Sequence, residues 1–143
     1  MELALEQARL AANLNETPIG AVLAWEGEVV ASAFNRRELD RIATAHAEIL
    51  AINEACRKLG GWRLHKATLY VTLEPCPMCA GAIINARIKR VVYGASDRKA
   101  GCCGSILDLF REPFNHHPEV TGGVLAEESA ALLSSFFKKL RKI

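Results

Sequence analysis

One histidine and two cysteines have the types and spacing that metal chemistry requires. His46 lies within residues 44–48, and Cys76 and Cys79 follow in the run Pro75-Cys76-Pro77-Met78-Cys79. Residues three apart on a helix share a face, so both sulfurs can reach one ion. A helix N-terminus lowers the pKa of a thiol and favours the thiolate, which is the form that binds metal. Two thiolates and an imidazole suit zinc, and three protein ligands leave the fourth position open, as in catalytic sites.

Glu48 is the candidate proton carrier, two residues after His46. On an ideal helix such residues point in nearly opposite directions. The two side chains can therefore serve one site only if the helix begins irregularly or if Glu48 flanks the metal. A carboxylate beside a metal can take a proton from an activated water and deliver it elsewhere. A first-turn carboxylate that only complements the helix dipole is the simpler alternative.

Cys102 and Cys103 compete with the catalytic interpretation. A third thiolate on the metal would close the site and make it structural. Their position in a glycine-rich loop marks neither as a ligand, so we expect free thiols. A Cys-x-x-Cys pair is also typical of thiol oxidoreductases, so a redox protein and a purely structural zinc module remain alternatives.

The pattern of apolar residues predicts the elements that position these side chains. Helices are expected over residues 1–14, 45–59, 76–86 and 126–142, and strands over 19–25, 29–34, 68–73 and 90–93. The first two strands predict an antiparallel hairpin, and the later strand–helix–strand unit should be parallel. Residues 35–42 and the segment around Pro113 and Pro118 are expected to be loops. Strands that alternate with helices after a hairpin indicate an α/β domain with a mixed sheet and helices on both faces.

Length and composition exclude several classes of protein. The chain has 143 residues, of which 50% are hydrophobic and 24% are charged. This predicts one globular domain over residues 1–143 rather than disorder or a fibrous repeat. No run of about 18 apolar residues is present, so no helix should span a membrane. Charged residues near the N-terminus are unlike a secretory signal, and we expect a cytoplasmic location.

The charge is unevenly distributed along the chain. The formal net charge is +2, yet residues 55–99 carry nine Lys and Arg against two Asp and Glu. The run Phe136-Phe137-Lys138-Lys139 adds aromatic and basic side chains near the C-terminus. Either pattern fits a solvated surface, and either also fits a surface that meets a polyanion such as RNA.

The signature His46-x-Glu48 with Pro75-Cys76-x-x-Cys79 resembles that of the zinc-dependent nucleoside deaminase superfamily. The resemblance extends to its tRNA-specific branch over essentially the whole chain, including residues 18–22, 69–76, 91–95 and 115–116. It implies a three-layer cytidine-deaminase-like fold with a mixed five-stranded sheet. It also implies one zinc per subunit, held by the histidine and the two cysteines.

The same resemblance implies the reaction and its partners. Glu48 would move the proton of a zinc-activated water, and adenosine would become inosine at the wobble position of a tRNA anticodon loop. The implied substrate contacts are Asn35, Ala47, Asp97, Lys99 and Phe137. A homodimer whose neighbouring subunit completes the RNA groove is implied as well. Of Phe136 and Phe137, we expect one to be buried and one to lie near RNA.

A sister enzyme that deaminates a free base or nucleotide is the alternative within the same superfamily. Cytosine, guanine and deoxycytidylate are the candidate substrates, and the metal site would be identical. The basic middle of the chain, the Asp97-Arg98-Lys99 run and the residues from Phe136 to Lys139 favour RNA over a free base.

Overall fold

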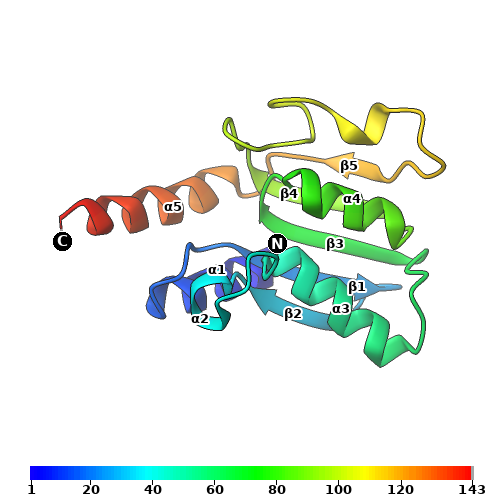
Figure 1. Cartoon of the computed structure of the whole chain (residues 1–143), viewed down its shortest axis with the longest axis horizontal. Helices are drawn as coiled ribbons and strands as arrows, with labels where there is room; N and C mark the ends of the chain where they lie inside the picture. The colour runs from blue at the N-terminus through cyan, green and yellow to red at the C-terminus, as the bar shows by residue number, and fades with distance from the viewer. Residues whose placement is uncertain (143) are drawn as a thin grey trace.

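The computed structural model describes residues 1–142 and arranges them in three layers (Figure 1). Within that range, five strands form one mixed sheet in the order β2-β1-β3-β4-β5. The strands are β1 (Gly20–Trp25), β2 (Glu28–Phe34), β3 (Ala67–Leu73), β4 (Arg90–Ala95) and β5 (Glu119–Thr121). The helices are α1 (Glu2–Asn13), α2 (Arg37–Asp40), α3 (Ala47–Leu59), α4 (Pro77–Asn85), α5 (Ala126–Arg141) and the 3₁₀ turn η1 (Leu109–Arg111). The expected α/β class is confirmed.

The directions of the strands decide which strand ends share an edge of the sheet. β1 pairs antiparallel with both β2 and β3. β3, β4 and β5 run parallel to one another, as predicted for β3 and β4. The carboxyl ends of β3 and β4 therefore meet at the same edge, where the chain turns from β3 into α4. Ligands of α/β proteins bind at such carboxyl ends.

Each face of the sheet is covered by its own pair of helices. Alternate strand residues such as Leu23, Leu69 and Val71 are fully buried in a core shared with residues of α3 and α4. On the other face, a Cβ at Gly20 would overlap the backbone of α1, and a Cβ at Gly94 would meet Ser129 of α5. Small residues at these two positions let both helices pack closely.

Two expectations about local structure are corrected. Residues 35–42 are not all loop, because α2 occupies Arg37–Asp40. A single helical turn is too short to show a 3.6-residue periodicity. The apolar pattern also missed β5, whose three residues are all exposed. The five strands implied by the family resemblance are all present.

The C-terminal helix differs from its prediction as well. Phe136 is half-buried and Phe137 is 44% exposed, so the expectation that one of them is buried is wrong. The reason is that α5 packs on the sheet near its start, where Ser129 is buried, and its second half extends beyond the sheet (Figure 1). Ile143, the last residue of the expected domain, lies outside the described residues. No helix in residues 1–142 is long and apolar enough to cross a membrane.

Candidate active site

His46 and Glu48 share one site because α3 begins between them. His46 is the N-cap residue and has an extended backbone, with φ −75° and ψ 150°, and the helix starts at Ala47. The change of backbone conformation removes the opposition that an ideal helix would impose on the two side chains. Glu48 lies in the first turn and is only 4% exposed. The helix thus begins in the way that a shared site requires.

Cys76 and Cys79 bring two sulfurs to the same histidine. Cys76 is the N-cap of α4, also with an extended backbone, and Pro77 occupies the first turn, where a proline is tolerated. His46 Nδ1 lies 3.6 Å from Cys76 Sγ and 3.5 Å from Cys79 Sγ. A tetrahedral zinc bonded at about 2.3 Å to sulfur and about 2.0–2.1 Å to nitrogen separates such atoms by about 3.5–3.6 Å. The donor set and its spacing fit zinc.

The protonation of the cysteines favours metal binding. Hydrogen bonds from Cys79 and His46 outweigh burial and lower the pKa of Cys76 to about 4. The hydrogen bond with Cys76 in turn raises the pKa of His46. The pKa of Cys79 is raised, chiefly because its proton is shared with the Cys76 thiolate. One thiolate is thus already formed, and a metal ion deprotonates a second coordinating thiol.

The other two cysteines of interest stand apart from this group. Within residues 1–142, the cluster of metal-capable side chains comprises His46, Cys76 and Cys79 alone. The Cys102 thiol is buried and donates to the Ala100 carbonyl at 3.6 Å. Burial raises the pKa of Cys103 to about 12, which keeps that thiol protonated.

A concave pocket opens beside the metal-capable cluster. Its volume is about 150 Å³, and its lining includes His46, Ala47, Glu48, Asn35 and Arg37. Drug-sized sites are larger, roughly 300 Å³ and above, so this pocket suits a group of the size of one base. Burial raises the pKa of Glu48 to about 7, and its own backbone N–H and His46 only partly oppose this. A carboxyl with such a pKa can accept and release a proton near neutral pH.

Asn35 serves both the turn and the pocket. It follows β2 and is 7% exposed. Its Oδ1 accepts the backbone N–H of Arg37 at 3.3 Å, and its Nδ2 donates to the Thr17 carbonyl at 3.4 Å. The side chain therefore closes an Asx turn and at the same time forms part of the pocket wall.

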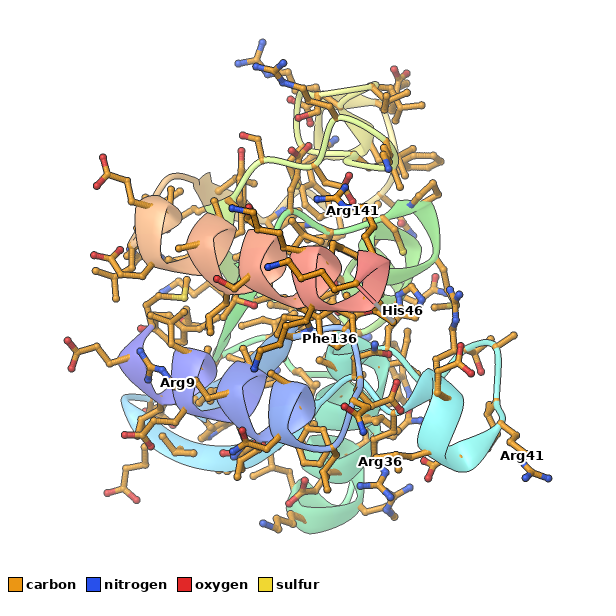
Figure 2. The ribbon with its side chains drawn as sticks, turned by 90° about the vertical axis from the view of Figure 1, so that its left-hand side faces the viewer. Arg9, Arg36, Arg41, His46, Phe136 and Arg141 are labelled. Carbon is orange, nitrogen blue, oxygen red and sulfur yellow. The ribbon has the colours of Figure 1, made fainter. Side chains whose placement is uncertain are left out.

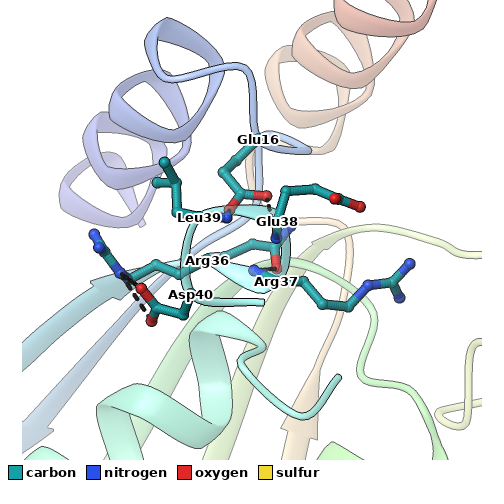
Figure 3. A network of polar contacts seen from close by, with 7 residues as sticks. Glu16, Arg36, Arg37, Glu38, Leu39 and Asp40 are labelled. Carbon is teal, nitrogen blue, oxygen red and sulfur yellow. Dashed lines mark hydrogen bonds and ion pairs between the residues drawn. The ribbon is translucent and has the colours of Figure 1, made fainter. Parts of the chain in front are cut away.

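Glu16 is a buried carboxylate near the pocket that the sequence did not reveal. It is 1% exposed, and its carboxylate accepts the backbone N–H groups of Glu38 at 3.2 Å and Leu39 at 2.7 Å (Figure 3). These contacts hold α2, and with it Arg37, at the pocket. Arg36 is engaged elsewhere, in an ion pair with Asp40 at 3.1 Å. No local signal marks Glu16, because its partners lie more than twenty residues away.

Glu74 is a second buried carboxylate that the sequence did not reveal. It is 2% exposed and directly precedes the Pro75-Cys76 turn. It accepts the backbone N–H groups of Asp97 (3.0 Å), Cys103 (2.8 Å) and Ser105 (3.2 Å), and also the Ser105 hydroxyl. Burial opposes ionisation, yet together these hydrogen bonds lower the pKa of Glu74. Glu74 thereby ties the 97–105 loop to the turn that carries a metal-capable cysteine.

The remaining predicted contact residues lie outside the pocket lining. Asp97 Oδ1 accepts the backbone N–H of Lys99 at 3.0 Å and shapes the turn of the 97–105 loop. Lys99 is exposed. Phe137 lies on the outer half of α5, next to Phe136, which lines a groove between α5 and the end of α1. The structure thus brings together the three metal-capable residues, Glu48, Ala47 and Asn35, whereas Asp97, Lys99 and Phe137 are not among the residues that line the pocket.

Comparison with known proteins identifies the family. The MafB19-like deaminase family matches residues 1–141. The tRNA-specific adenosine deaminase of Bacillus subtilis (strain 168) is 54% identical over 143 residues, which cover 99% of this chain and 89% of that protein. This chain belongs to the tRNA-specific adenosine deaminase family.

Solved structures agree with this family assignment, and they differ in how similar they are to this chain in sequence and in fold. A structure from a study of A-to-I editing by tRNA:A34 deaminases matches with a TM-score of 0.89 and 51% identity, over 93% of this chain and 97% of that one. A guanine deaminase from Nitrosomonas europaea matches with a TM-score of 0.78 and 28% identity, over 94% and 81%. The fold is shared with free-base deaminases, and the sequence is much closer to the tRNA-specific branch.

Proposed function

We propose that this protein hydrolyses adenosine to inosine at the wobble position of a tRNA anticodon loop. The observation that carries the proposal is the buried Glu48 beside His46, Cys76 and Cys79 at one base-sized pocket. Relatives of about half-identical sequence that are named for tRNA adenosine deamination support the choice of substrate. Anticodon bases splay out of their loop, so presenting one costs little unpairing energy.

One zinc ion per chain is the proposed cofactor, held by His46, Cys76 and Cys79. Zinc supplies a Lewis acid that activates water for attack on C6 of adenine. Glu48 would take one proton of the water on its carboxylate and deliver it to N1 of the ring, and would then take the second proton, from the hydroxyl on C6, and deliver it to the departing amine, so that water and adenosine yield inosine and ammonia. A carboxyl with a pKa of about 7 suits both transfers.

The pocket walls orient the base. Asn35 is proposed to hydrogen-bond the base edge, since its side chain is already fixed by the Asx turn and loses little freedom on binding. Ala47 is fully buried and lines the pocket without bulk. Arg37, whose backbone is held by Asn35, is placed to contact a phosphate that flanks the base.

The surface around the pocket suits RNA. Figure 2 shows Arg9, Arg41 and Arg141 on the same side of the molecule as His46 and Phe136. Cations spread around a pocket attract a phosphate backbone. We propose that Asp97 and Lys99 of the 97–105 loop contact the RNA next to the flipped base. Phe137, which is 44% exposed, would stack on an unpaired base.

We further propose one deaminase domain over residues 1–143 that acts as a cytoplasmic homodimer. All strands of residues 1–142 share one sheet, which supports a single domain. Ile106, Leu107 and Phe114 are each at least 46% exposed and lie in one segment. Exposed apolar groups of this kind are typical of an interface. Sedimentation velocity at micromolar concentration tests the dimer, and a purely monomeric species would contradict it.

The experiment that tests the function is an inosine assay on an anticodon stem-loop with adenosine at the wobble position. Free adenosine, cytidine and guanine serve as parallel substrates for the same zinc-loaded protein. Inosine in the stem-loop alone is the expected result. Turnover of guanine instead would place the chain with the free-base deaminases that share its fold. Thiol oxidation of Cys76 and Cys79 without bound metal would favour the redox alternative.

A further inference from the structure

A cationic cleft lies at the end of the sheet opposite the candidate active site. Its volume is about 440 Å³, and its lining residues are Arg63, His65, Arg87, Lys89, His116, His117 and Glu119. They lie before or at the starts of β3, β4 and β5, whereas Cys76 follows the end of β3. β3 has seven residues. At about 3.3 Å per residue the basic cleft, as we name it, lies roughly 20 Å from the active-site pocket along the strand.

The segments that line the basic cleft are joined to one another by hydrogen bonds. Four hydrogen bonds join the three segments that line it: Leu64 N–H to Ala86 O (2.7 Å), Lys89 N–H to Ala67 O (3.1 Å), Glu119 N–H to Lys89 O (2.9 Å) and His116 Nε2 to Ile88 O (2.7 Å). The cations therefore project from a fixed frame rather than from independent loops. His116 is not among the residues that line the active-site pocket.

The cations of the basic cleft lack counter-charges. Arg63, Arg87 and Lys89 have no carboxylate within ion-pair distance among residues 1–142, and Glu119 is the one acid in the lining. The guanidinium groups of Arg63 and Arg87 lie 5.1 and 5.8 Å from the ring of Trp62, which is 55% exposed. Both guanidinium groups therefore lie against the same indole ring. Such an arrangement is stabilised when an anion binds.

Arg87 is fixed more firmly than an ordinary surface arginine. Its backbone lies in the left-handed region, with φ 60°, and it directly follows Ala86, the C-cap residue of α4. One of its guanidinium nitrogens donates to the Ile84 carbonyl at 2.7 Å. The planar guanidinium keeps further N–H donors, and this geometry suits phosphate oxygens.

We propose that the basic cleft binds clustered phosphate groups, and that the backbone of the RNA substrate supplies them. The RNA assignment rests on the proposed function. A tRNA carries phosphates well beyond the anticodon loop, so one molecule can reach a second site about a strand length from the pocket. The same chemistry could be met by a free polyphosphate, and the experiment separates the two sources.

The test pairs a cleft variant with a control of equal charge. Arg63→Gln/Lys89→Gln removes two unpaired cations, whereas Lys58→Gln/Arg111→Gln removes two exposed cations that are already in ion pairs. Binding of a full-length tRNA transcript and of inorganic triphosphate is measured over a salt series. The cleft variant should bind tRNA about tenfold more weakly at low salt, and its salt slope should fall by about 2. The control should match the wild type.

The outcomes separate this proposal from the proposed function. If the cleft variant binds both tRNA and triphosphate as tightly as the control does, the proposal that the basic cleft binds phosphate groups is wrong. If the cleft variant loses triphosphate binding but binds tRNA normally, the RNA backbone does not supply the phosphate groups, and the cleft is a site for a free polyphosphate. Inosine formation in a minimal stem-loop is scored separately, and both variants should retain it. If the wild type makes no inosine but the cleft variant still binds tRNA more weakly, the proposed deaminase function is wrong and the proposed phosphate site is supported. Thermal melts check folding, and Arg63→Gln alone serves if the double variant unfolds.

Discussion

Glu48, in the pocket, and Glu74, which holds the 97–105 loop, are buried to nearly the same extent, and their surroundings shift the pKa of the two carboxyl groups in opposite directions. Glu48 is 4% exposed and Glu74 is 2% exposed. Burial dominates at Glu48 and raises its pKa to about 7. At Glu74, hydrogen bonds from the 97–105 loop overcome burial and lower the pKa. Burial with weak opposition thus gives a carboxyl that can exchange a proton near neutral pH, whereas burial with several hydrogen-bond donors favours the charged form.

Glu16 is a further buried carboxylate that anchors a segment of the chain. It is as buried as Glu74, at 1% exposed, and it accepts two backbone N–H groups of α2. It anchors a short helix beside the pocket, as Glu74 anchors a loop. The three carboxylates predict a graded set of outcomes when each is replaced by the isosteric glutamine, because glutamine keeps the shape and loses the charge.

The largest effect is expected for Glu48→Gln. An amide cannot carry the proton, so kcat for inosine formation should fall by about 10²–10⁴. Zinc content, measured by metal analysis, should remain that of the wild type, because Glu48 is outside the group of three metal-capable residues. Glu54→Gln, on the same helix and in an exposed ion pair with Lys58, is the control. Full activity of Glu48→Gln would remove Glu48 from the mechanism.

Glu74→Gln should act mainly on stability. Its amide NH₂ would face backbone N–H donors that now point at a carboxylate, and the free energy of unfolding should fall by about 1–3 kcal/mol. Chemical denaturation measures this loss. Activity should fall far less than for Glu48→Gln. A variant as stable as the exposed control Glu54→Gln would show that Glu74 is no anchor.

Glu16→Gln should have a smaller effect of the same kind. Its remaining amide oxygen can still accept one of the two α2 N–H groups, so the expected loss is about 0.5–1.5 kcal/mol. Because α2 lines the pocket, KM for the stem-loop should rise while kcat changes little. A steady-state series at one salt concentration gives both constants. A change in kcat alone would contradict the anchoring role.

The smallest effect is expected for Arg37→Gln, which tests what the Glu16 anchor positions. Loss of one phosphate contact should reduce the salt slope of RNA binding by about 1 and leave turnover at saturating RNA unchanged. Arg36→Gln is the matched control, because Arg36 is its sequence neighbour and is already paired with Asp40. Equal salt slopes for the two variants would exclude Arg37 from the RNA contact.

Local patterns predicted much of the fold, and their failures share one cause. The four longer strands and four longer helices were found within about two residues of their ends, because each has enough turns or alternations to show a period. α2 and β5 were missed because a single turn and three exposed residues carry no such signal. The expectation that one of Phe136 and Phe137 is buried was wrong, because an amphipathic pattern does not reveal where a helix extends beyond its sheet.

By itself, the sequence determined the chemical core of this protein. His46, Glu48, Cys76 and Cys79 stand in two short motifs at helix starts, and spacing within each motif is a local property of the chain. Only the tertiary structure decided what surrounds that core. Glu16 and Glu74 act on partners more than twenty residues away, and the basic cleft gathers cations from three separate loops. Such contacts depend on which strands become neighbours, and the order β2-β1-β3-β4-β5 is settled by packing of the whole sheet.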